Sequence, residues 1–249
     1  MVSSGCAKVG TEALIGDGNE GATAHPNEAY TAMTALDDEI AQRLQLYFGD
    51  RLAAYGDDPR GVDWHSAAAQ QARFDALLAI GLTEGATVLD AGCGLGHLYA
   101  YLCERGIVVR YTGCDLSEAH VERARVLYPQ ARFIAADAAR VAAAETFDYV
   151  IACGLLHLRV PRWGRWAWTL VRALYAGCRT GLAFTVPQRG YGHPPALATV
   201  DPADWSVRLR TLCPDVATTT LAPWGDAVFF LHKSVQSETR DRSARSGER

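Results

Sequence analysis

The stretch TVLDAGCGLGHLYAYL, residues 87–102, places Gly92, Gly94 and Gly96 within five positions, directly after a short apolar run. An acid, Asp90, precedes the glycines, and no lysine follows them. Glycines allow the main chain to turn tightly and let a ligand lie against it, and the helix expected next offers free N–H groups at its first turn. We therefore expect a strand, a ligand-binding turn and a helix in this order.

On both sides of this turn, apolar runs typical of strands alternate with helical patterns. Five such runs are expected to form parallel strands, because a helical pattern separates each one from the next. Two further runs are separated by little more than Gly225-Asp226, and so short a link forces antiparallel pairing. The expected strands are 86–91, 108–115, 131–137, 147–153, 181–186, 216–224 and 227–233. The sequence thus predicts an α/β domain whose sheet ends in a hairpin.

Two helical segments are expected before this alternation. Apolar residues recur at helical intervals over residues 31–48, and Gly and Pro then interrupt the pattern. A second helix is expected over 65–80 with Gly81 as its C-cap, and Ser117 is expected to cap a later helix. The expected parts of the chain are a disordered leader (1–28), an N-terminal helical cap (29–81), the ligand-binding core (82–235) and a disordered tail (236–249).

Composition narrows the class of protein. The 249 residues are 49% hydrophobic and 21% charged, an ordinary globular balance. The formal net charge of -4 argues against a polyanionic partner such as nucleic acid. We see no membrane span and no signal peptide, and the seven cysteines include no C-x-x-C pair. We predict a cytoplasmic monomer or homodimer with reduced thiols, no metal site and no nucleic-acid or membrane partner.

Three classes of ligand compete for the glycine-rich turn. A nucleoside triphosphate would call for G-x-x-x-x-G-K-[ST], and this lysine is missing. A dinucleotide would call for G-x-G-x-x-G, whose third glycine falls at His97. S-adenosylmethionine has no phosphate and carries positive charges, which suit a nearby acid such as Asp90.

In the segment VLDAGCGLG, residues 88–96, the chain resembles the first motif of the class I S-adenosylmethionine-dependent methyltransferases. The family's second landmark is an acid at the end of the second strand, which holds the ribose hydroxyls; here it is Asp115, 19 residues past Gly96. The third, near the adenine amino group, is Asp137, and the fourth strand ends at Cys153-Gly154, which would border the transferred methyl.

The resemblance covers residues 63–233 and carries expectations about fold and cofactor. It implies a Rossmann-like doubly wound seven-stranded sheet, mostly parallel with an antiparallel C-terminal hairpin strand, preceded by N-terminal helices. The implied cofactor is S-adenosyl-L-methionine, and its product is S-adenosyl-L-homocysteine. The residues expected to bind it are Asp90, Gly92, Cys93, Gly94, Gly96, Asp115, Leu116, Asp137, Ala138, Cys153 and Arg73.

Several side chains could either contact the cofactor or substrate, or have a purely structural role. In related enzymes a basic or aromatic residue before the first strand often meets the methionine carboxylate, so Arg73 is either that residue or a solvated or intrahelical one. Trp64 and Tyr55 either close over the cofactor or pack in the core. The stripe Trp163, Trp166 and Leu170 is expected to be core packing rather than a substrate box.

Methyl transfer needs no protein nucleophile, but a general base helps when the acceptor starts protonated. His157, four residues beyond Cys153, is the candidate base; the alternatives are a helix cap or a solvent-facing side chain. His193 is a second candidate.

Several motifs are missing from the sequence, and their absence reduces the number of possible classes of methyl acceptor. The fourth strand is followed by ACGLLHL, without the Asn/Asp-Pro-Pro-aromatic turn of nucleic-acid amino-methyltransferases. The double-glutamate loop of the protein arginine enzymes and a magnesium-binding acid cluster are also missing. We predict methyl transfer to an O, N or S atom of a small molecule, and the Ala- and Arg-rich composition points to bacterial specialised metabolism. The alternatives are an NAD(P)-dependent oxidoreductase and a non-methylating protein that binds the same cofactor.

Overall fold

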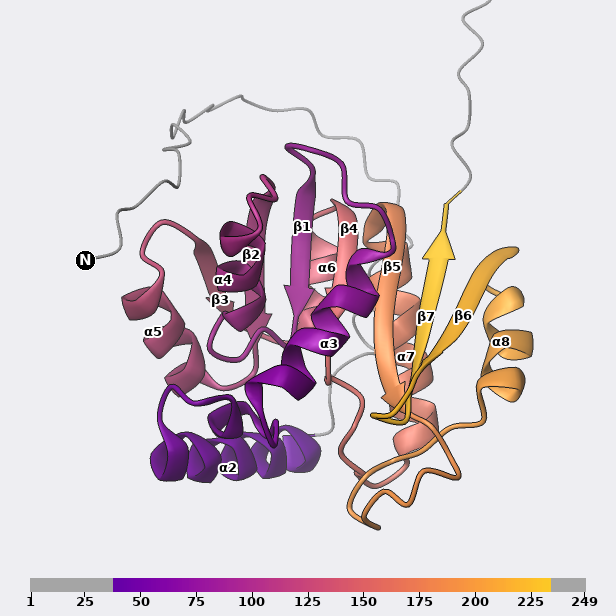
Figure 1. Ribbon diagram of the computed structural model, residues 1–249, viewed down its shortest axis with the longest axis horizontal. Coiled ribbons are helices and arrows are strands. Elements are labelled where there is room, and N and C mark those ends of the chain that lie inside the picture. The colour runs from indigo at the N-terminus through magenta and orange to yellow at the C-terminus, as the bar shows by residue number, and fades with distance from the viewer. Residues whose placement is uncertain (1–37, 234–249) are drawn as a thin grey trace, which may run out of the picture.

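The computed structural model describes residues 38–233 of the chain, which form a seven-stranded sheet with helices on both faces (Figure 1). The strands run in the order β3-β2-β1-β4-β5-β7-β6. Strands β1 to β5 pair in parallel, and β7 is antiparallel to both of its neighbours. The strand bounds are β1 (Thr87–Ala91), β2 (Arg110–Asp115), β3 (Arg132–Ala135), β4 (Phe147–Ala152), β5 (Cys178–Pro187), β6 (Asp215–Leu221) and β7 (Asp226–His232). This topology confirms the predicted fold class.

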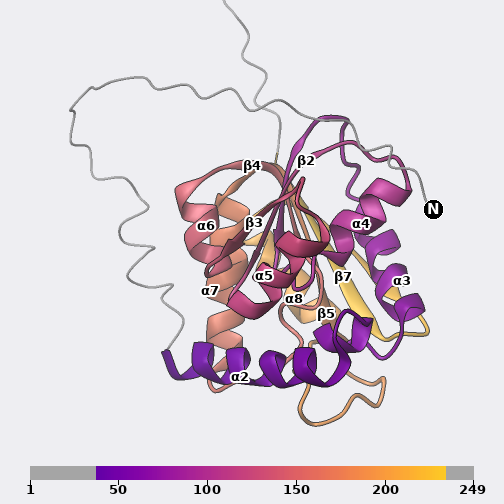
Figure 2. The ribbon, with the colours of Figure 1, turned by 90° about the vertical axis from the view of Figure 1, so that its left-hand side faces the viewer.

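The helices divide between the two faces of the sheet (Figure 2). Helices α3, α4 and α5 contribute to the core on one face, and α6, α7 and α8 to the core on the other. Their bounds, with those of α2 and the short 3-10 helix η1, are α2 (Asp38–Tyr55), η1 (Pro59–Val62), α3 (Ala67–Leu78), α4 (His97–Glu104), α5 (Glu118–Leu127), α6 (Ala138–Ala144), α7 (Trp163–Ala176) and α8 (Pro202–Arg210).

The central strands are apolar on both faces because helices cover both. On β1, Val88 packs toward α3 and α4, whereas its neighbour Leu89 packs toward α6 and α7, and both are fully buried. A continuous apolar run is what a strand buried on both sides requires. The edge strand β6 is exposed along most of its length and carries threonines, which suits a strand with one free edge.

The reversed strand β7 lies between β5 and β6. Its pairing with β6 starts at the register Leu221↔Asp226, and its pairing with β5 ends at Pro187↔Asp226. The chain turns back at Gly225, whose φ of +70° lies in the left-handed region that glycine adopts freely. The hairpin therefore forms where the sequence predicted it.

Local boundaries differ from the prediction in several places. Helix α3 ends at Leu78 with Ala79 as its C-cap, so the prediction of Gly81 as the cap is wrong. Helix α2 continues through Gly49 to Tyr55 instead of ending at residue 48, because one glycine costs only about 1 kcal/mol relative to alanine and helix formers follow it. Ser117 is the N-cap residue of α5 as predicted, but its hydroxyl contacts His120 Nδ1 at 2.8 Å and makes no capping hydrogen bond.

The predicted ends of the chain fall largely outside the described residues. The leader (1–28), the tail (236–249) and the first part of the cap lie there. The boundary at residues 81 and 82 between cap and core stays a prediction. No helix within residues 38–233 is long and apolar enough to cross a bilayer.

Helix α2 lies across the carboxyl ends of the parallel strands, at the bottom of Figure 1. In an open α/β sheet, ligands bind beyond these ends, at the point where the strand order reverses. Here that point lies between β1 and β4, which are neighbours in the sheet although two strands separate them in the sequence. Helix α2 therefore covers the edge at which this fold binds ligands.

Candidate functional site

A cavity lies beyond the carboxyl ends of β1, β2, β3 and β4, with about 1080 Å³ of space between atoms, including the part open to solvent. We call these strand ends and the turn 90–96 the floor, and residues 38–66, which cover them, the roof. Ten residues of the predicted site line the cavity: Asp90, Gly92, Cys93, Gly94, Asp115, Leu116, Asp137, Ala138, Cys153 and His157.

The turn after β1 has the bare backbone that its sequence predicts. Gly92 and Gly94 have φ values of +77° and +50°, and a Cβ on Gly94 would lie 2.6 Å from Cγ1 of Val62 in the roof. The N–H groups of Gly92 and Cys93 donate to the carbonyl of Cys114 at 2.8 and 2.9 Å. These bonds fasten the turn to β2, and the missing side chains leave room for the roof to approach.

Asp115, at the end of β2, is held by main-chain donors. The N–H of Gly94 donates to its Oδ2 at 2.9 Å, and the N–H of Ser117 donates to its Oδ1 at 2.8 Å. Burial raises the pKa of this carboxyl, and the two N–H groups oppose the rise. The carboxylate is thereby fixed in direction before any ligand arrives.

Asp90, at the end of β1, is buried, and the hydroxyl of Tyr111 donates to its Oδ2 at 2.6 Å. Burial raises the pKa of Asp90 to about 7, against the lowering effect of the tyrosine hydrogen bond. A cation bound nearby would favour the ionised form of this carboxyl.

Asp137 follows β3 and is the N-cap residue of α6. Its Oδ1 accepts a hydrogen bond from the N–H of Ala139 at 2.8 Å. Asp90, Asp115 and Asp137 thus stand at the ends of three adjacent strands and line one cavity. This arrangement is electronegative and suits a cationic ligand.

Two residues of the predicted site do not line the cavity. Gly96 starts α4 with a φ of +76°, and a Cβ there would lie 2.8 Å from the ring of Phe133. Arg73 is 6% exposed and forms an ion pair with Asp226 of β7. Its guanidinium lies 4.6 Å from the ring centre of Trp64. Arg73 is therefore neither solvated nor at the cavity wall.

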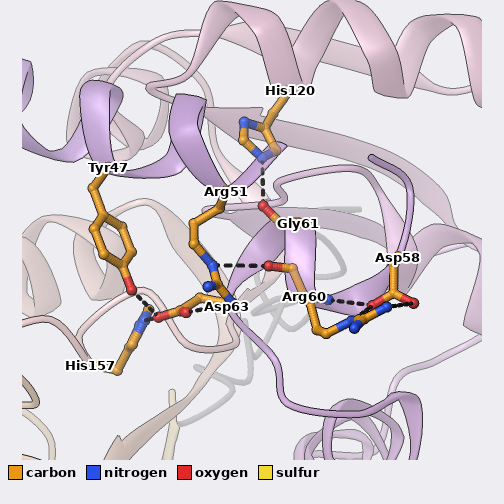
Figure 3. Close-up of polar contacts among 8 residues, drawn as sticks. All are labelled: Tyr47, Arg51, Asp58, Arg60, Gly61, Asp63, His120 and His157. Atoms are coloured by element: carbon orange, nitrogen blue, oxygen red, sulfur yellow. Dashed lines mark hydrogen bonds and ion pairs between the residues drawn. The ribbon is translucent and has the colours of Figure 1, made fainter. Parts of the chain in front are cut away.

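His157 lines the cavity, and both of its ring nitrogens have partners, of which Figure 3 shows Asp63. Nδ1 contacts the carbonyl oxygen of Gly154, and Nε2 lies 3.4 Å from Oδ2 of Asp63. Asp63 also accepts from the hydroxyl of Tyr47 at 2.8 Å and pairs with Arg51 at 3.2 Å. Because each ring nitrogen lies against an oxygen atom of the protein, service as a base requires one of these contacts to open.

The remaining aromatic candidates separate into two groups. Trp64 lines the cavity, and so do Trp166 and Leu170 of the α7 stripe, which also pack in the core as expected. Trp163 instead packs on Trp205 at 5.7 Å between ring centres. Tyr55 is 38% exposed beneath the guanidinium of Arg51. The second candidate base, His193, contacts the carbonyl of Gly225 at 2.9 Å and does not line the cavity.

Sequence reasoning missed most of the roof. Leu44, Gln45, Phe48 and Val62 line the cavity but belong to no motif. The amphipathic pattern of α2 indicates a buried face without indicating what the face covers. Only the folded chain places this helix over the strand ends.

Similarity to known proteins agrees with this geometry. Residues 88–177, about a third of the chain, match the family described as "Methyltransferase domain". A trans-aconitate 2-methyltransferase of Azoarcus sp. (strain BH72) is 33% identical over 142 residues, which are 56% of this chain and 54% of that protein. An S-adenosyl-L-methionine-dependent Diels-Alderase of Talaromyces variabilis is 46% identical over 46 residues, 18% of this chain and 15% of that protein.

Among solved structures, the magnesium protoporphyrin IX methyltransferase of Synechocystis PCC 6803 with bound SAM is similar with a TM-score of 0.58 and 22% identity. The similarity covers 80% of this chain and 99% of that one, and it bears on the fold alone. The chain spans about half the length of the trans-aconitate relative, and less of the Diels-Alderase. Residues 88–177 thus form a methyltransferase domain, and the glycine turn and the strand ends that carry the acids lie inside it.

Proposed function

We propose that this protein binds S-adenosyl-L-methionine in the cavity and transfers its methyl group to a small molecule. The observation that carries the proposal is the convergence of Asp90, Asp115 and Asp137 with the glycine turn in one cavity. The cofactor is a cation without phosphate, and these carboxylates complement it. The glycines leave a cradle that a Cβ would fill.

Each part of the cofactor has a proposed partner in the floor. Asp115 would accept hydrogen bonds from the two ribose hydroxyls, since a carboxylate has enough acceptor sites for both. Asp137 and Ala138 would lie at the adenine, with Leu116 against its ring. The turn of Gly92, Cys93 and Gly94 would run along the methionine part.

The other predicted cofactor residues act less directly in this proposal. Cys153 would border the transferred methyl. Gly96 starts the helix that follows the turn. Arg73 remains the proposed partner of the methionine carboxylate, but it can bind there only after its ion pair with Asp226 opens. Gln70, one turn earlier on α3, already lines the cavity.

When bound, the cofactor supplies a methyl carbon that an acceptor lone pair attacks; the C–S bond breaks, its electrons stay on sulfur as S-adenosyl-L-homocysteine, and the acceptor loses any proton it carried. The contribution of this chain is to align the acceptor with that carbon and to exclude water. His157 remains the proposed base for an O, N or S acceptor, after its contact with Asp63 opens. A role in bacterial specialised metabolism, in the cytoplasm, as a monomer or homodimer, belongs to the same proposal.

The proposal is tested by calorimetric titration of the full chain with S-adenosyl-L-homocysteine and, separately, with NADPH. Binding of the former alone supports it, and binding of NADPH alone would indicate an oxidoreductase. Incubation with S-adenosyl-L-methionine and a panel of small acceptors then tests turnover by release of S-adenosyl-L-homocysteine. Cofactor binding with no turnover on any acceptor would favour a non-methylating protein, the class to which the Diels-Alderase relative points.

A further inference from the structure

The walls of the cavity indicate which acceptors fit it. We propose that the acceptor is an uncharged compound built on an aromatic ring, held by aromatic side chains, and that a polycarboxylate is excluded. The inference rests on the proposed function, because it takes the acids of the floor as partners of the cofactor.

Besides the strand-end acids and several uncharged polar side chains, the lining includes large aromatic rings and several leucines. Phe48 comes from α2, Trp64 from the roof segment after η1, and Trp166 from α7. Phe48 and Trp64 flank His157, with ring centres 6.2 and 6.4 Å from the imidazole, and the Trp64 ring is stacked on it at 24°. Flat aromatic walls favour a flat ring between them through offset or edge contacts.

No lysine or arginine lines the cavity in the part of the chain that the structure describes. The arginines that flank it are matched with acids: Arg51 pairs with Asp63, Arg73 with Asp226 and Arg123 with Asp57. Residues 1–37 add only one lysine or arginine to the sequence, Lys8. Residues 38–233 therefore place no lysine or arginine in the cavity wall that could neutralise an anionic acceptor.

A tricarboxylate would meet this cavity at a large electrostatic disadvantage. Buried carboxylates need partners of opposite charge or several hydrogen-bond donors. Here three aspartates line the same space and would repel them. An uncharged ring loses little on leaving water and gains contacts with Phe48, Trp64 and Trp166.

The test uses the full chain saturated with S-adenosyl-L-homocysteine and titrated with 2-naphthol, indole and trans-aconitate. At least one of the two uncharged rings is expected to bind tenfold or more tightly than trans-aconitate. Trp166→Ala should weaken that binding at least fivefold, whereas Trp166→Phe should retain most of it. Trp168→Ala is the matched control, because Trp168 lies on the same helix beneath Arg208 and does not line the cavity; it should change the affinity less than twofold.

Failure of the inference is distinguishable from failure of the proposed function. A protein that does not bind S-adenosyl-L-homocysteine defeats the proposed function. If that product binds, then trans-aconitate binding as tightly as the rings, or binding of none of the three compounds, overturns the acceptor class alone. Equal losses in Trp166→Ala and Trp168→Ala would also overturn it, because the effect would then come from packing of α7.

Discussion

The floor and the roof of the cavity are held by different kinds of bond. The floor is fastened by main-chain hydrogen bonds: the strand ladders, the turn amides on Cys114, and the amides of Gly94 and Ser117 on Asp115. The roof is fastened by individual side chains. Four such contacts are Gln45 with the Leu116 carbonyl, Asp57 with Arg123, Asp63 with His157, and His120 with the Gly61 carbonyl.

This difference has consequences for motion and for specificity. Each of these contacts, as an ion pair or as a single hydrogen bond, contributes only about 1 kcal/mol, so the roof is expected to open at a lower free energy than the floor. The cofactor would then meet a preformed floor, whereas the acceptor would meet walls that include the movable roof. Four changes test this contrast, in order of decreasing expected change in stability or affinity, and a fifth tests the rate of methyl transfer.

The largest effect is expected at Asp90 in the floor. Its pKa is raised by burial to about 7, so its contribution to stability is present at acid pH and is lost as pH rises through that value. Because the unfolded carboxyl ionises near pH 3.9, the wild type should lose roughly 3 kcal/mol more than Asp90→Asn between pH 5 and pH 8. Urea unfolding of both proteins at the two pH values measures this. If the unfolding free energies of the two proteins change equally between pH 5 and pH 8, Asp90 is ionised in the folded protein throughout this range.

The second effect is on cofactor affinity. Asp115→Ala should raise the dissociation constant of S-adenosyl-L-homocysteine by at least tenfold, about 1.4 kcal/mol or more, because the ribose would lose its acceptor. Calorimetric titration measures this. Asp115→Asn is the control that keeps the shape and one acceptor, and it should fall between the wild type and the alanine variant. An unchanged affinity in the alanine variant would place the ribose elsewhere.

The third effect concerns the contact between floor and roof at Gly94. A Cβ there would lie 2.6 Å from Val62 Cγ1, so Gly94→Ala should cost about 1–2 kcal/mol from overpacking in addition to backbone strain. Gly106→Ala is the matched control, since Gly106 has a φ of +66° and no atom within 4 Å of the added Cβ. Thermal unfolding compares the two variants. If Gly94→Ala and Gly106→Ala lose equal stability, the roof can move away from the added methyl group without a measurable cost.

The smallest effect is expected in the roof, at the contact between Asp63 and His157. Burial raises the pKa of Asp63, but hydrogen bonds from His157 and Tyr47 and the nearby charges lower it overall. Asp63→Asn should therefore cost less than about 1 kcal/mol at pH 7, and the loss should vanish as pH falls through the lowered pKa, where the wild-type carboxyl is protonated too. Urea unfolding at pH 7 and pH 3 measures it.

The same contact tests the role of His157. If His157 is the base, His157→Ala should slow methyl transfer by about 10²-fold or more with little change in S-adenosyl-L-homocysteine affinity. Asp63→Ala, which removes the same contact but keeps the imidazole, should keep most of the rate. Equal rate losses in the two variants would show that His157 acts by holding the roof in place through Asp63, and not as a base.

The residues of the floor were predictable because their positions depend on short segments of chain. Asp90, Asp115 and Asp137 each come at or just after the end of an apolar run, and parallel strands bring such ends to one edge of the sheet. Arg73 and Trp166 were harder to place. The partner of Arg73 is Asp226, 153 residues away, and the direction of Trp166 depends on how α7 packs.

The sequence by itself determined the order of strands and helices, the reversed β7, the bare turn after β1 and the acids of the floor. These features follow from apolar periodicity, glycine conformation and main-chain hydrogen bonding, which act over a few residues at a time. Only the tertiary structure decided that α2 covers the floor, that His157 contacts Asp63, and that Phe48, Trp64 and Trp166 line the cavity with no lysine or arginine from residues 38–233. Those features depend on contacts between side chains far apart in the sequence, for which no local pattern exists.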